Sequence, residues 1–308
     1  MKILIIDYVS PLLLELLEES KINYLYLPTH SEQFILDKIN KFNGLIVRNR
    51  FQINNFFLSK CKNLQFIARY GSGMESIDVK YANQLGIKCF NSAEGNCNAV
   101  SEHALGMLLS LLHKIHKSME ELKTGVWKRN ENLGNELSGK NIGVIGYGNT
   151  GKAFCEKLKG FNCNIYCYDK YKKNYGTSSI QECSMESLYN HADVISLHIP
   201  INDETKYLIN DYFIQKMRRP FYIINTSRGK IINTSDLING LKNKKIIGAC
   251  LDVIEYECAG FINTNFNDDY NYLLNCKNII MTPHIAGLSY ESHLKISQTL
   301  FDKIIQLI

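Results

Sequence analysis

Residues 142–169 read IGVIGYGNTGKAFCEKLKGFNCNIYCYD, and this stretch decides the fold. An apolar segment at 142–145 predicts a strand, and Gly146, Gly148 and Gly151 follow it. A helical segment and a second apolar strand complete the unit. The first glycine permits a tight turn, the second lets a pyrophosphate approach the backbone, and the third lets helix and strand pack closely. The pattern predicts a dinucleotide site at the N-terminus of the helix, where free N–H groups attract phosphate; a plain structural turn is the alternative.

An acidic residue ends the second strand of this unit. Asp169 lies 18 residues beyond Gly151, where a carboxylate can accept hydrogen bonds from the ribose hydroxyls of a dinucleotide. A carboxylate repels a 2′-phosphate, so we expect NAD to be preferred over NADP. Lys170, Lys172 and Lys173 follow it, and they are either a solvated loop or cations that tolerate a cofactor phosphate.

The length and composition of the chain exclude several classes of protein. It has 308 residues, of which 45% are hydrophobic, so it is long enough for two domains and is not typical of disorder. Its 35 basic and 30 acidic residues leave a net charge of +5, without a basic run of the kind that binds nucleic acid. We therefore expect a small-molecule partner and neither nucleic acid nor membrane.

The sequence predicts no export or membrane segment. The first apolar run meets Asp7 at once, and the run at 104–112 is far shorter than the ~20 residues of a membrane helix. The ten cysteines are scattered without a CxxC pair, which favours reduced thiols over disulfides and gives no metal-binding pattern. We expect a cytoplasmic protein that binds no metal.

Strand-like and helix-like segments alternate along both halves of the chain. Predicted strands lie at 2–6, 22–27, 44–47, 65–69, 87–89, 142–145, 163–168, 194–198, 221–225, 246–252 and 279–282. Predicted helices lie at 11–19, 31–40, 99–117, 152–159, 211–217, 234–242 and 289–308. Such alternation is typical of parallel sheets that helices cover on both faces. The expected fold class is α/β, with two doubly wound parallel-sheet domains.

The last predicted helix is left over once six strands have completed one doubly wound domain, and we place it back on the first part of the chain. The prediction is a discontinuous, flavodoxin-like substrate domain at 1–97 plus 285–308. A Rossmann NAD-binding domain at 98–284 is inserted in it, with a ligand cleft between the two. The helix at 99–117 is apolar nearly all round, so it is buried either within the protein or against a second subunit.

Three ionisable side chains follow successive strands of the second domain, namely Arg228, Glu257 and His284. Ligands of open α/β sheets bind outside the carboxyl ends of the strands, so these loops can converge on one crevice. Histidine exchanges protons near neutral pH, a carboxylate holds its tautomer, and a guanidinium can grip a substrate carboxylate. The three side chains suit a reaction in which hydride transfer converts a C–OH group into C=O or the reverse. Each residue alone has a structural explanation, such as a turn cap or a surface charge.

Motifs along nearly the whole chain resemble those of the D-isomer-specific 2-hydroxyacid dehydrogenases. In order, they are Arg69–Gly73 (RYGSG), Gly95–Asn96 with Ala99–Ala104 (AVSEHA), Ile145–Gly151 (IGYGNTG), Asp193–Pro200 (DVISLHIP), Asn225–Gly229 (NTSRG), Leu251–Val253 (LDV) and Thr282–His284 (TPH). Several motifs in the right order are more specific than any one of them. The resemblance implies an NAD-dependent oxidoreductase that acts on CH–OH groups.

The resemblance also implies roles for individual residues. Arg228 would orient the substrate, and His284 would be the acid/base, paired with Glu257. The backbone at Ser72 and Gly73 would hold the substrate carboxylate. The cofactor residues that it implies are Gly146, Tyr147, Gly148, Asn149, Thr150, Gly151, Asp169, His198, Pro200, Thr226, Ser227, Asp252 and Gly287, with Thr226 and Asp252 beside the nicotinamide.

Further features bear on the branch of this family and on assembly. Cys258 stands where many members carry proline, which changes the stiffness of the loop after Glu257. A glutamine at position 257 would have indicated the formate-oxidising branch, which uses no acid/base pair, and the acid argues against it. The long helix after Ala99 resembles the dimer contact of the family, so we expect a homodimer through the helix near 99–117.

Two arginines suggest a substrate. Arg48 and Arg50 lie two apart at the end of a predicted strand, so they point to one face if the extension continues. Two guanidiniums suit a phosphate, and the pattern resembles the 3-phosphoglycerate dehydrogenases, in which arginines here contact the substrate phosphate; solvated charges are the alternative. We expect NAD-dependent oxidation of 3-phospho-D-glycerate to 3-phosphohydroxypyruvate, a reaction of L-serine biosynthesis.

Other functions stay open. The enzyme alternative is a glyoxylate or hydroxypyruvate reductase, or another small D-2-hydroxyacid dehydrogenase. The non-enzymatic alternative is an NAD-sensing corepressor, against which the lack of a basic targeting segment or disordered tail argues. Because the sequence ends at Ile308, we expect no C-terminal regulatory domain and no serine feedback through one.

Overall fold

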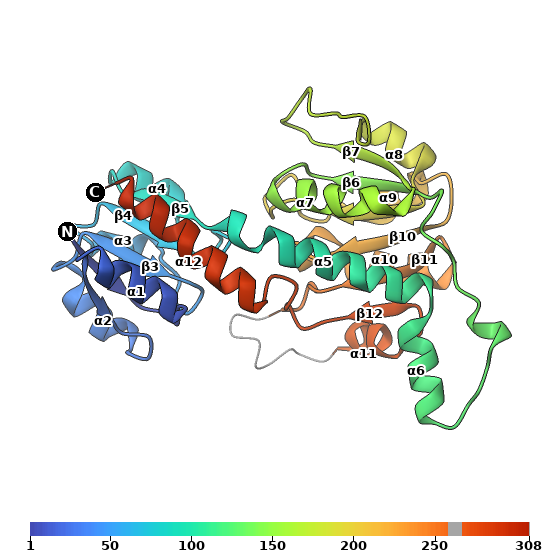
Figure 1. Ribbon diagram of the computed structural model, residues 1–308, viewed down its shortest axis with the longest axis horizontal. Coiled ribbons are helices and arrows are strands. Elements are labelled where there is room, and N and C mark those ends of the chain that lie inside the picture. Colours follow the sequence, from blue (N-terminus) through green and yellow to red (C-terminus); the bar gives the residue numbers. More distant parts are fainter. Residues whose placement is uncertain (258–266, 308) are drawn as a thin grey trace. The chain divides into compact units, whose positions relative to one another are not determined.

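The structure is a computed structural model that describes residues 1–257 and 267–307. The chain divides into two compact units. Unit 1 is Met1–Cys97 with Leu288–Ile308, and unit 2 is Asn98–Gly287. Each unit is built on its own parallel sheet (Figure 1). The α/β fold class with two parallel-sheet domains is therefore confirmed.

Unit 1 contains a five-stranded sheet in the order β2-β1-β3-β4-β5, in which every neighbouring pair is parallel. Its strands are β1 (Lys2–Ile5), β2 (Asn23–Tyr26), β3 (Gly44–Val47), β4 (Phe66–Arg69) and β5 (Lys88–Asn91). This is the strand order of flavodoxin-like folds.

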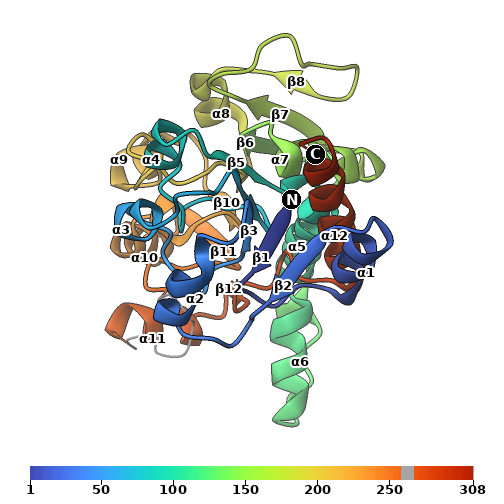
Figure 2. The same cartoon turned by 90° about the vertical axis from the view of Figure 1, so that its left-hand side faces the viewer.

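Helices cover both faces of the unit 1 sheet (Figure 2). They are α1 (Pro11–Glu19), α2 (Glu32–Ile39), α3 (Asn55–Ser59), α4 (Val79–Gln84) and α12 (Tyr290–Ile305). Side chains alternate along β1, so Ile3 and Ile5 pack with Leu13 of α1 and Leu300 of α12. Leu4 points the other way and packs with α2, α3 and α4. The last helix thus lies on the sheet built by the first part of the chain.

Unit 2 contains a seven-stranded parallel sheet in the order β12-β11-β10-β9-β6-β7-β8. Its strands are β6 (Asn141–Ile145), β7 (Asn164–Tyr168), β8 (Gln181–Glu182), β9 (Val194–Leu197), β10 (Phe221–Asn225), β11 (Ile246–Leu251) and β12 (Ile279–Met281). The prediction of six strands was wrong, because β8 has only two residues and no apolar run. The chain order reverses between β6 and β9, which is where doubly wound sheets bind ligands.

Helices cover both faces of this sheet as well. They are α5 (Ala93–Leu112), α7 (Asn149–Leu158), α8 (Met185–His191), α9 (Asp211–Lys216), α10 (Thr234–Lys242) and α11 (Asp268–Asn275), with short 3-10 turns at Asn130–Asn132, Lys159–Phe161 and Gly229–Ile231. α6 (Ile115–Lys123) has no buried residue and extends away from the sheet (Figure 1). α5 and α7 pack on one face, in a core with Val144 and Ile224. α8 to α11 pack on the other face, in a core with Ile223 and Leu251.

The single helix predicted at 99–117 is two helices, so that prediction was wrong. α5 starts six residues earlier, at Ala93, and Lys114 adopts a left-handed φ of 53° that separates it from α6. A left-handed helix end is usually marked by glycine, and lysine gave no such signal. Nowhere in the described ranges is a helix both long and apolar enough to cross a membrane.

Candidate active site

The glycine turn lies between β6 and α7. Gly146 has a φ of 97°, and a Cβ there would lie 2.3 Å from the carbonyl oxygen of His198. A Cβ on Gly151 would lie 1.9 Å from the carbonyl oxygen of Gly146. Gly148, by contrast, faces open space, and α7 has no side-chain cap. The first N–H groups of α7 are therefore accessible to a phosphate.

Asp169 directly follows β7. One carboxylate oxygen accepts a hydrogen bond from the Tyr147 N–H at 2.8 Å, and the other accepts from the N–H groups of Tyr171 and Lys172 at 2.9 Å each. Burial raises the pKa of Asp169, but these backbone hydrogen bonds outweigh it and hold the pKa below its ordinary value. Asp169 therefore presents an ionised carboxylate beside the glycine turn.

Two of the lysines after Asp169 are held by protein acceptors. The Nζ of Lys172 donates to the carbonyl oxygen of Tyr147 at 2.8 Å. The Nζ of Lys170 lies 2.7 Å from a carboxylate oxygen of Glu204. Neither ammonium group is offered to a phosphate without breaking such a contact.

Two buried polar groups at the carboxyl edge of the unit 2 sheet have no partner among the described residues. They are Nδ1 of His198, just after β9, and Oγ1 of Thr226, just after β10. His198 is held at Nε2 by the Ser196 hydroxyl at 2.9 Å, and burial lowers its pKa to about 3, so the ring is neutral. Buried polar groups in proteins are nearly always hydrogen-bonded. With the glycine turn and Asp169, these two groups fit a bound dinucleotide.

Arg228, Glu257 and His284 follow β10, β11 and β12, which are neighbours in the sheet. The structure brings two of them into contact, because Nδ1 of His284 lies 2.8 Å from Oε2 of Glu257. The side chains are 34% and 21% exposed, so a ligand can reach this pair. The arrangement can transfer a proton at the carboxyl edge of the sheet.

The backbone holds both members of the pair. Oε1 of Glu257 accepts a hydrogen bond from the Ile254 N–H at 2.7 Å, which turns Oε2 toward His284. His284 has a φ of 54°, which is uncommon for a residue other than glycine. Its N–H donates to the carbonyl oxygen of Asp252 at 2.8 Å. Backbone strain of this kind is typical of functional sites.

Asp252 is buried, with 1% exposure, and it holds the loop that carries His284. Its carboxylate accepts hydrogen bonds from the Thr282 hydroxyl at 2.6 Å and from the N–H groups of Ile285 and Ala286 at 2.8 Å each. The family resemblance implies a place for Asp252 beside the nicotinamide. The structure shows both carboxylate oxygens engaged within the loop, so its contacts are those of a loop anchor.

His103 of α5 completes this network, although it is not among the predicted site residues. Its Nε2 lies 3.0 Å from the Thr282 hydroxyl and 3.7 Å from a carboxylate oxygen of Asp252. His103 stands within the AVSEHA motif, but the contact joins residues 179 apart in sequence. Nothing in the local pattern could reveal it.

Arg228 lies in a rigid turn. The Asn225 side chain bridges the turn, since its Nδ2 donates to the carbonyl oxygen of Arg228 at 2.9 Å and its Oδ1 accepts from the Ser227 N–H at 3.1 Å. The Ser227 hydroxyl donates to the carbonyl oxygen of Leu197 at 2.5 Å. Ser227 is thus used within the protein, and the turn places Arg228 at the end of β10.

In unit 1, the loop after β4 carries Ser72 and Gly73. The Asn91 side chain donates to the carbonyl oxygen of Ser72 at 2.6 Å, and the Ser72 hydroxyl donates to Asn96 at 2.7 Å. Within the described ranges, no acceptor is bonded to the N–H groups of Ser72 and Gly73. Adjacent open N–H groups of this kind can bind an anion.

Arg50 does not continue the strand, and its guanidinium is engaged by the protein. β3 ends at Val47, so the extension that would place Arg50 beside Arg48 is lost. Nη1 of Arg50 donates to the carbonyl oxygen of His30 at 2.6 Å, and Nη2 donates to those of Leu27, at 3.1 Å, and Ile6. Arg50 therefore joins the ends of β1 and β2.

Arg48 differs from Arg50. Its N–H donates to a carboxylate oxygen of Asp7 at 2.5 Å, and its guanidinium has no hydrogen-bond acceptor in the part of the chain that the structure describes. It lies near His293 of α12, whose pKa is lowered by burial and then by the charge of Arg48. Arg48 is the cation of this pair that a ligand can use.

The other predicted residues are also placed. Asn149 and Thr150 open the first turn of α7, and Tyr147 is buried in the glycine turn, stacked on Tyr175 at 4.5 Å. Pro200 is exposed in the loop after β9, and Gly287 ends unit 2. Cys258 lies outside the described residues. Within the described ranges, no group of three His, Cys, Asp or Glu residues is placed to bind a metal ion.

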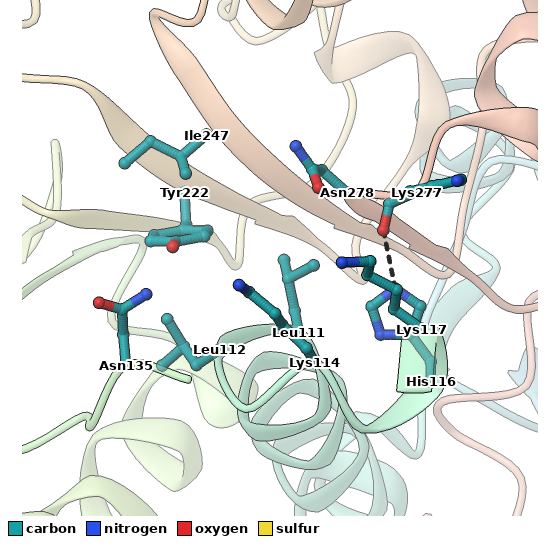
Figure 3. Close-up of a pocket in the computed structure, with 10 residues that line it drawn as sticks. All are labelled: Leu111, Leu112, Lys114, His116, Lys117, Asn135, Tyr222, Ile247, Lys277 and Asn278. Carbon is teal, nitrogen blue, oxygen red and sulfur yellow. Dashed lines mark hydrogen bonds between the residues drawn. The ribbon is translucent and has the colours of Figure 1, made fainter. Parts of the chain in front are cut away.

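A hollow of about 300 Å³ lies at the opposite edge of the unit 2 sheet, where β10, β11 and β12 begin (Figure 3). The described residues that line it are Leu111, Leu112, Lys114, His116, Lys117, Asn135, Tyr222, Ile247, Lys277 and Asn278. No predicted site residue is among them. The hollow and the predicted active site are therefore different places in unit 2.

The fold and these residues define a class of α/β proteins that bind a dinucleotide at a glycine turn. Residues 105–286 match the family model described as D-isomer specific 2-hydroxyacid dehydrogenase, NAD binding domain. The chain belongs to the D-isomer-specific 2-hydroxyacid dehydrogenase family. Unit 2 therefore contains its nicotinamide-dinucleotide-binding domain.

Curated relatives carry different names. The chain is 32% identical over 260 residues to hydroxypyruvate reductase of Thermotoga maritima. The aligned residues cover 84% of this chain and 83% of that protein. It is 28% identical over 309 residues to D-3-phosphoglycerate dehydrogenase of Archaeoglobus fulgidus, and the alignment covers 100% of this chain and 57% of that protein. The chain thus spans little more than half the length of the second relative.

A solved structure is similar over the whole chain. An acyclic imino acid reductase superposes with a TM-score of 0.87 at 26% identity, covering 100% of this chain and 97% of that one. The fold is therefore shared with reductases whose names differ from those of the sequence relatives.

Proposed function

We propose that the protein is an NAD-dependent dehydrogenase of a D-2-hydroxy acid. The observation that carries the proposal is the Glu257–His284 hydrogen bond of 2.8 Å, at the carboxyl edge of a dinucleotide-binding sheet. A bound nicotinamide supplies the hydride acceptor for oxidation and the hydride donor for reduction.

The chain's own residues handle the proton and the substrate. His284 takes the proton of the C2 hydroxyl on Nε2 during oxidation and returns it during reduction. Glu257 accepts a hydrogen bond from Nδ1–H, which fixes the tautomer that presents Nε2, and its charge stabilises the imidazolium. Arg228 grips the substrate and polarises its carbonyl group.

Unit 1 supplies the features that select the substrate in this proposal. The open N–H groups of Ser72 and Gly73 hold the carboxylate, and the guanidinium of Arg48 holds a phosphate. This favours 3-phospho-D-glycerate, in line with the relatives named D-3-phosphoglycerate dehydrogenase. The guanidinium of Arg50 is bonded to backbone carbonyl oxygens, so of the two arginines only Arg48 binds the phosphate in this proposal. Hydroxypyruvate or glyoxylate is the alternative substrate, as in the relatives named for their reduction.

The substrate proposal is tested by Arg48→Ala. Because only a phosphorylated substrate uses the guanidinium, we expect kcat/KM for 3-phosphohydroxypyruvate to fall about 10-fold or more, and that for hydroxypyruvate to change within about twofold. Lys41→Ala, which removes an exposed charge from unit 1, is the matched control. An equal loss on both substrates, or no loss on either, rejects 3-phospho-D-glycerate as the substrate.

For the cofactor, we propose a preference for NAD. The ionised Asp169 repels a 2′-phosphate, and Lys170 and Lys172 are held by Glu204 and by the Tyr147 carbonyl. The imino acid reductase with a similar fold was solved with NADPH and D-arginine, so both nicotinamide cofactors occur on this fold. The loop after β7 is the part of this chain that favours NAD.

For assembly and location, we propose a homodimer in the cytoplasm. The predicted contact at 99–117 falls on α5 and the start of α6, and α6 carries the exposed apolar side chains. Ile115, Met119 and Leu122 are 56%, 54% and 49% exposed and follow one another at helical spacing. Trp127, which is 78% exposed, lines the same hollow as Leu122, and we call these four residues the α6 stripe. Exposed apolar stripes of this kind mark protein contacts.

A further inference from the structure

The loop that carries Glu257 contains a second glutamate, Glu255, which the proposed reaction does not use. One of its carboxylate oxygens accepts a hydrogen bond from the Tyr207 hydroxyl at 2.5 Å. The other accepts from the backbone N–H of Thr234 at 3.1 Å. Tyr207 follows β9, Thr234 follows β10 and Glu255 follows β11. One half-buried carboxylate thus ties together the segments after three neighbouring strands.

Both partners of Glu255 are themselves fixed. Thr234 is the first residue of α10, where an N–H without an intrahelical acceptor attracts a negative charge. Tyr207 has a left-handed φ of 53°, and its N–H donates to the carbonyl oxygen of Lys230 at 2.8 Å. The Glu255 carboxylate is therefore bound to two points that do not move independently.

The turn from Ile254 to Glu257 depends on this attachment. The Glu257 side chain and backbone bond back to Ile254, with Oε1 accepting at 2.7 Å and N–H donating at 3.4 Å. Gly229, in the turn after Arg228, packs against the same peptide, since a Cβ there would lie 1.8 Å from the Ile254 carbonyl oxygen. The turn is fixed at Ile254 by packing and at Glu255 by its carboxylate, and Glu257 comes two residues later.

We propose that Glu255 is a positioning residue, which holds this turn so that Oε2 of Glu257 reaches Nδ1 of His284. The inference rests on the proposed function, in which the Glu257–His284 pair moves a proton. A catalytic pair needs its geometry kept to within about 0.5 Å, and a displacement of about 1 Å can cost about 100-fold in rate. Glu255 acts through Glu257 and touches neither substrate nor cofactor.

The test is the pair of variants Glu255→Gln and Tyr207→Phe. Glutamine keeps the size of the side chain but loses one of its two acceptors, whereas phenylalanine leaves the carboxylate in place and removes one donor. We expect kcat to fall about 10-fold in Glu255→Gln, or about 1.4 kcal/mol, and less in Tyr207→Phe. The dissociation constant of NADH, measured by fluorescence titration, should stay within about twofold of the wild-type value. The control is Glu18→Gln in unit 1, where Glu18 likewise accepts a tyrosine hydroxyl, that of Tyr24, at 2.5 Å.

A double-mutant cycle separates positioning from general destabilisation. If Glu255 acts only through Glu257, then Glu255→Gln has no further effect on kcat in a Glu257→Gln background. Equal losses in both backgrounds, or full activity of Glu255→Gln, would overturn the proposal. If the Glu255 variant fails to fold, the loss of kcat caused by Tyr207→Phe is compared in the same two backgrounds, and equal losses or full activity overturn the proposal.

A readout independent of turnover distinguishes this proposal from the proposed function. The imidazole proton bonded to Glu257 gives a low-field proton NMR resonance, assigned by its loss in His284→Ala. We expect it to vanish in Glu257→Gln, to shift or broaden in Glu255→Gln, and to be unchanged in Glu18→Gln. An unchanged resonance in Glu255→Gln overturns the positioning role. This NMR pattern in a protein that turns over no 2-keto acid would reject the proposed function and leave the positioning role standing.

Discussion

The Glu257–His284 pair depends on residues that lie behind it. Asp252 binds three donors of the loop that carries His284, and His103 contacts the Thr282 hydroxyl within the same network. Buried polar groups are stable only when such networks are complete. The geometry of the Glu257–His284 contact is therefore a property of a buried hydrogen-bond network as well as of the two side chains.

Sequence reasoning predicted the residues at the strand ends but not what holds them. Glu257 and His284 could be found because parallel strands present their carboxyl ends at one edge. The contacts of Arg50 could not be predicted, because its partners are carbonyl oxygens of the segments after β1 and β2, which leave no mark in the sequence around Arg50. Asp252 was predicted as a site residue, yet its contacts with the 282–286 loop appear only in three dimensions.

At the scale of a residue, His198 predicts a pH dependence of stability. Its pKa is about 3 in the folded protein and about 6.5 when unfolded, so between these values the unfolded chain binds more protons. The stability linked to His198 is present above pH 6.5 and is lost as the pH falls, by up to about 1.4 kcal/mol per pH unit. Urea unfolding of wild type and His198→Asn at pH 7 and pH 5 measures the difference in slope.

The variant His198→Asn should lose less stability over this interval than the wild type. His113→Asn, at an exposed position of unit 2, is the control and should follow the wild type. Identical slopes for all three proteins would show that His198 does not stay neutral in the folded state.

Among the elements, the long apolar segments were predictable and the short or unmarked ones were not. β3 and α1 have the predicted bounds, 44–47 and 11–19. β8 has two residues and pairs only at the edge of its sheet, so no periodic pattern can form. No glycine marks the break at Lys114, because the lysine itself adopts the left-handed φ.

At the scale of an element, the contact between α7 and the glycine turn predicts the effect of Gly151→Ala. A Cβ there would lie 1.9 Å from a backbone oxygen that has no room to shift, so α7 must move away from the turn. We expect the affinity for NADH to fall about 10-fold or more, as measured by fluorescence titration. Gly160→Ala, just after α7, meets no atom within 4 Å and should bind NADH as the wild type does. Equal affinities of the two variants would contradict the placement of the cofactor at this turn.

For the whole molecule, two units with separate sheets follow from the chain path, which leaves the first sheet at α5 and returns to it at α12. Sequence reasoning could predict the return because the last amphipathic helix had no strand left to cover in the second sheet. It could not predict the exposed apolar side chains of α6, because nothing in the sequence marks the break at Lys114 that separates α6 from α5.

At this scale, the α6 stripe predicts the oligomeric state. Met119→Glu places a charge in the middle of the stripe, so the proposed dimer should dissociate to monomers in sedimentation velocity. Leu274→Glu on α11, where the side chain is 53% exposed, is the control and should remain dimeric. A wild-type monomer, or a Met119→Glu dimer, would exclude this surface as the contact.

We propose that a reduced nicotinamide bound by unit 2 gives a hydride to the C2 carbon of a 2-keto acid while His284 supplies the proton. The direct measurement uses NADH deuterated at the transferred C4 position, with 3-phosphohydroxypyruvate, hydroxypyruvate and glyoxylate as substrates and mass spectrometry with chiral separation of the products. The glycolate formed from glyoxylate is chiral only through its deuterium, which chiral separation does not resolve, so the two larger acids decide the configuration. We expect deuterium at C2 of a D-configured product, and a rate at least about 100-fold lower in His284→Ala. Product of L configuration, product without deuterium, or no product from any of the three acids would contradict it.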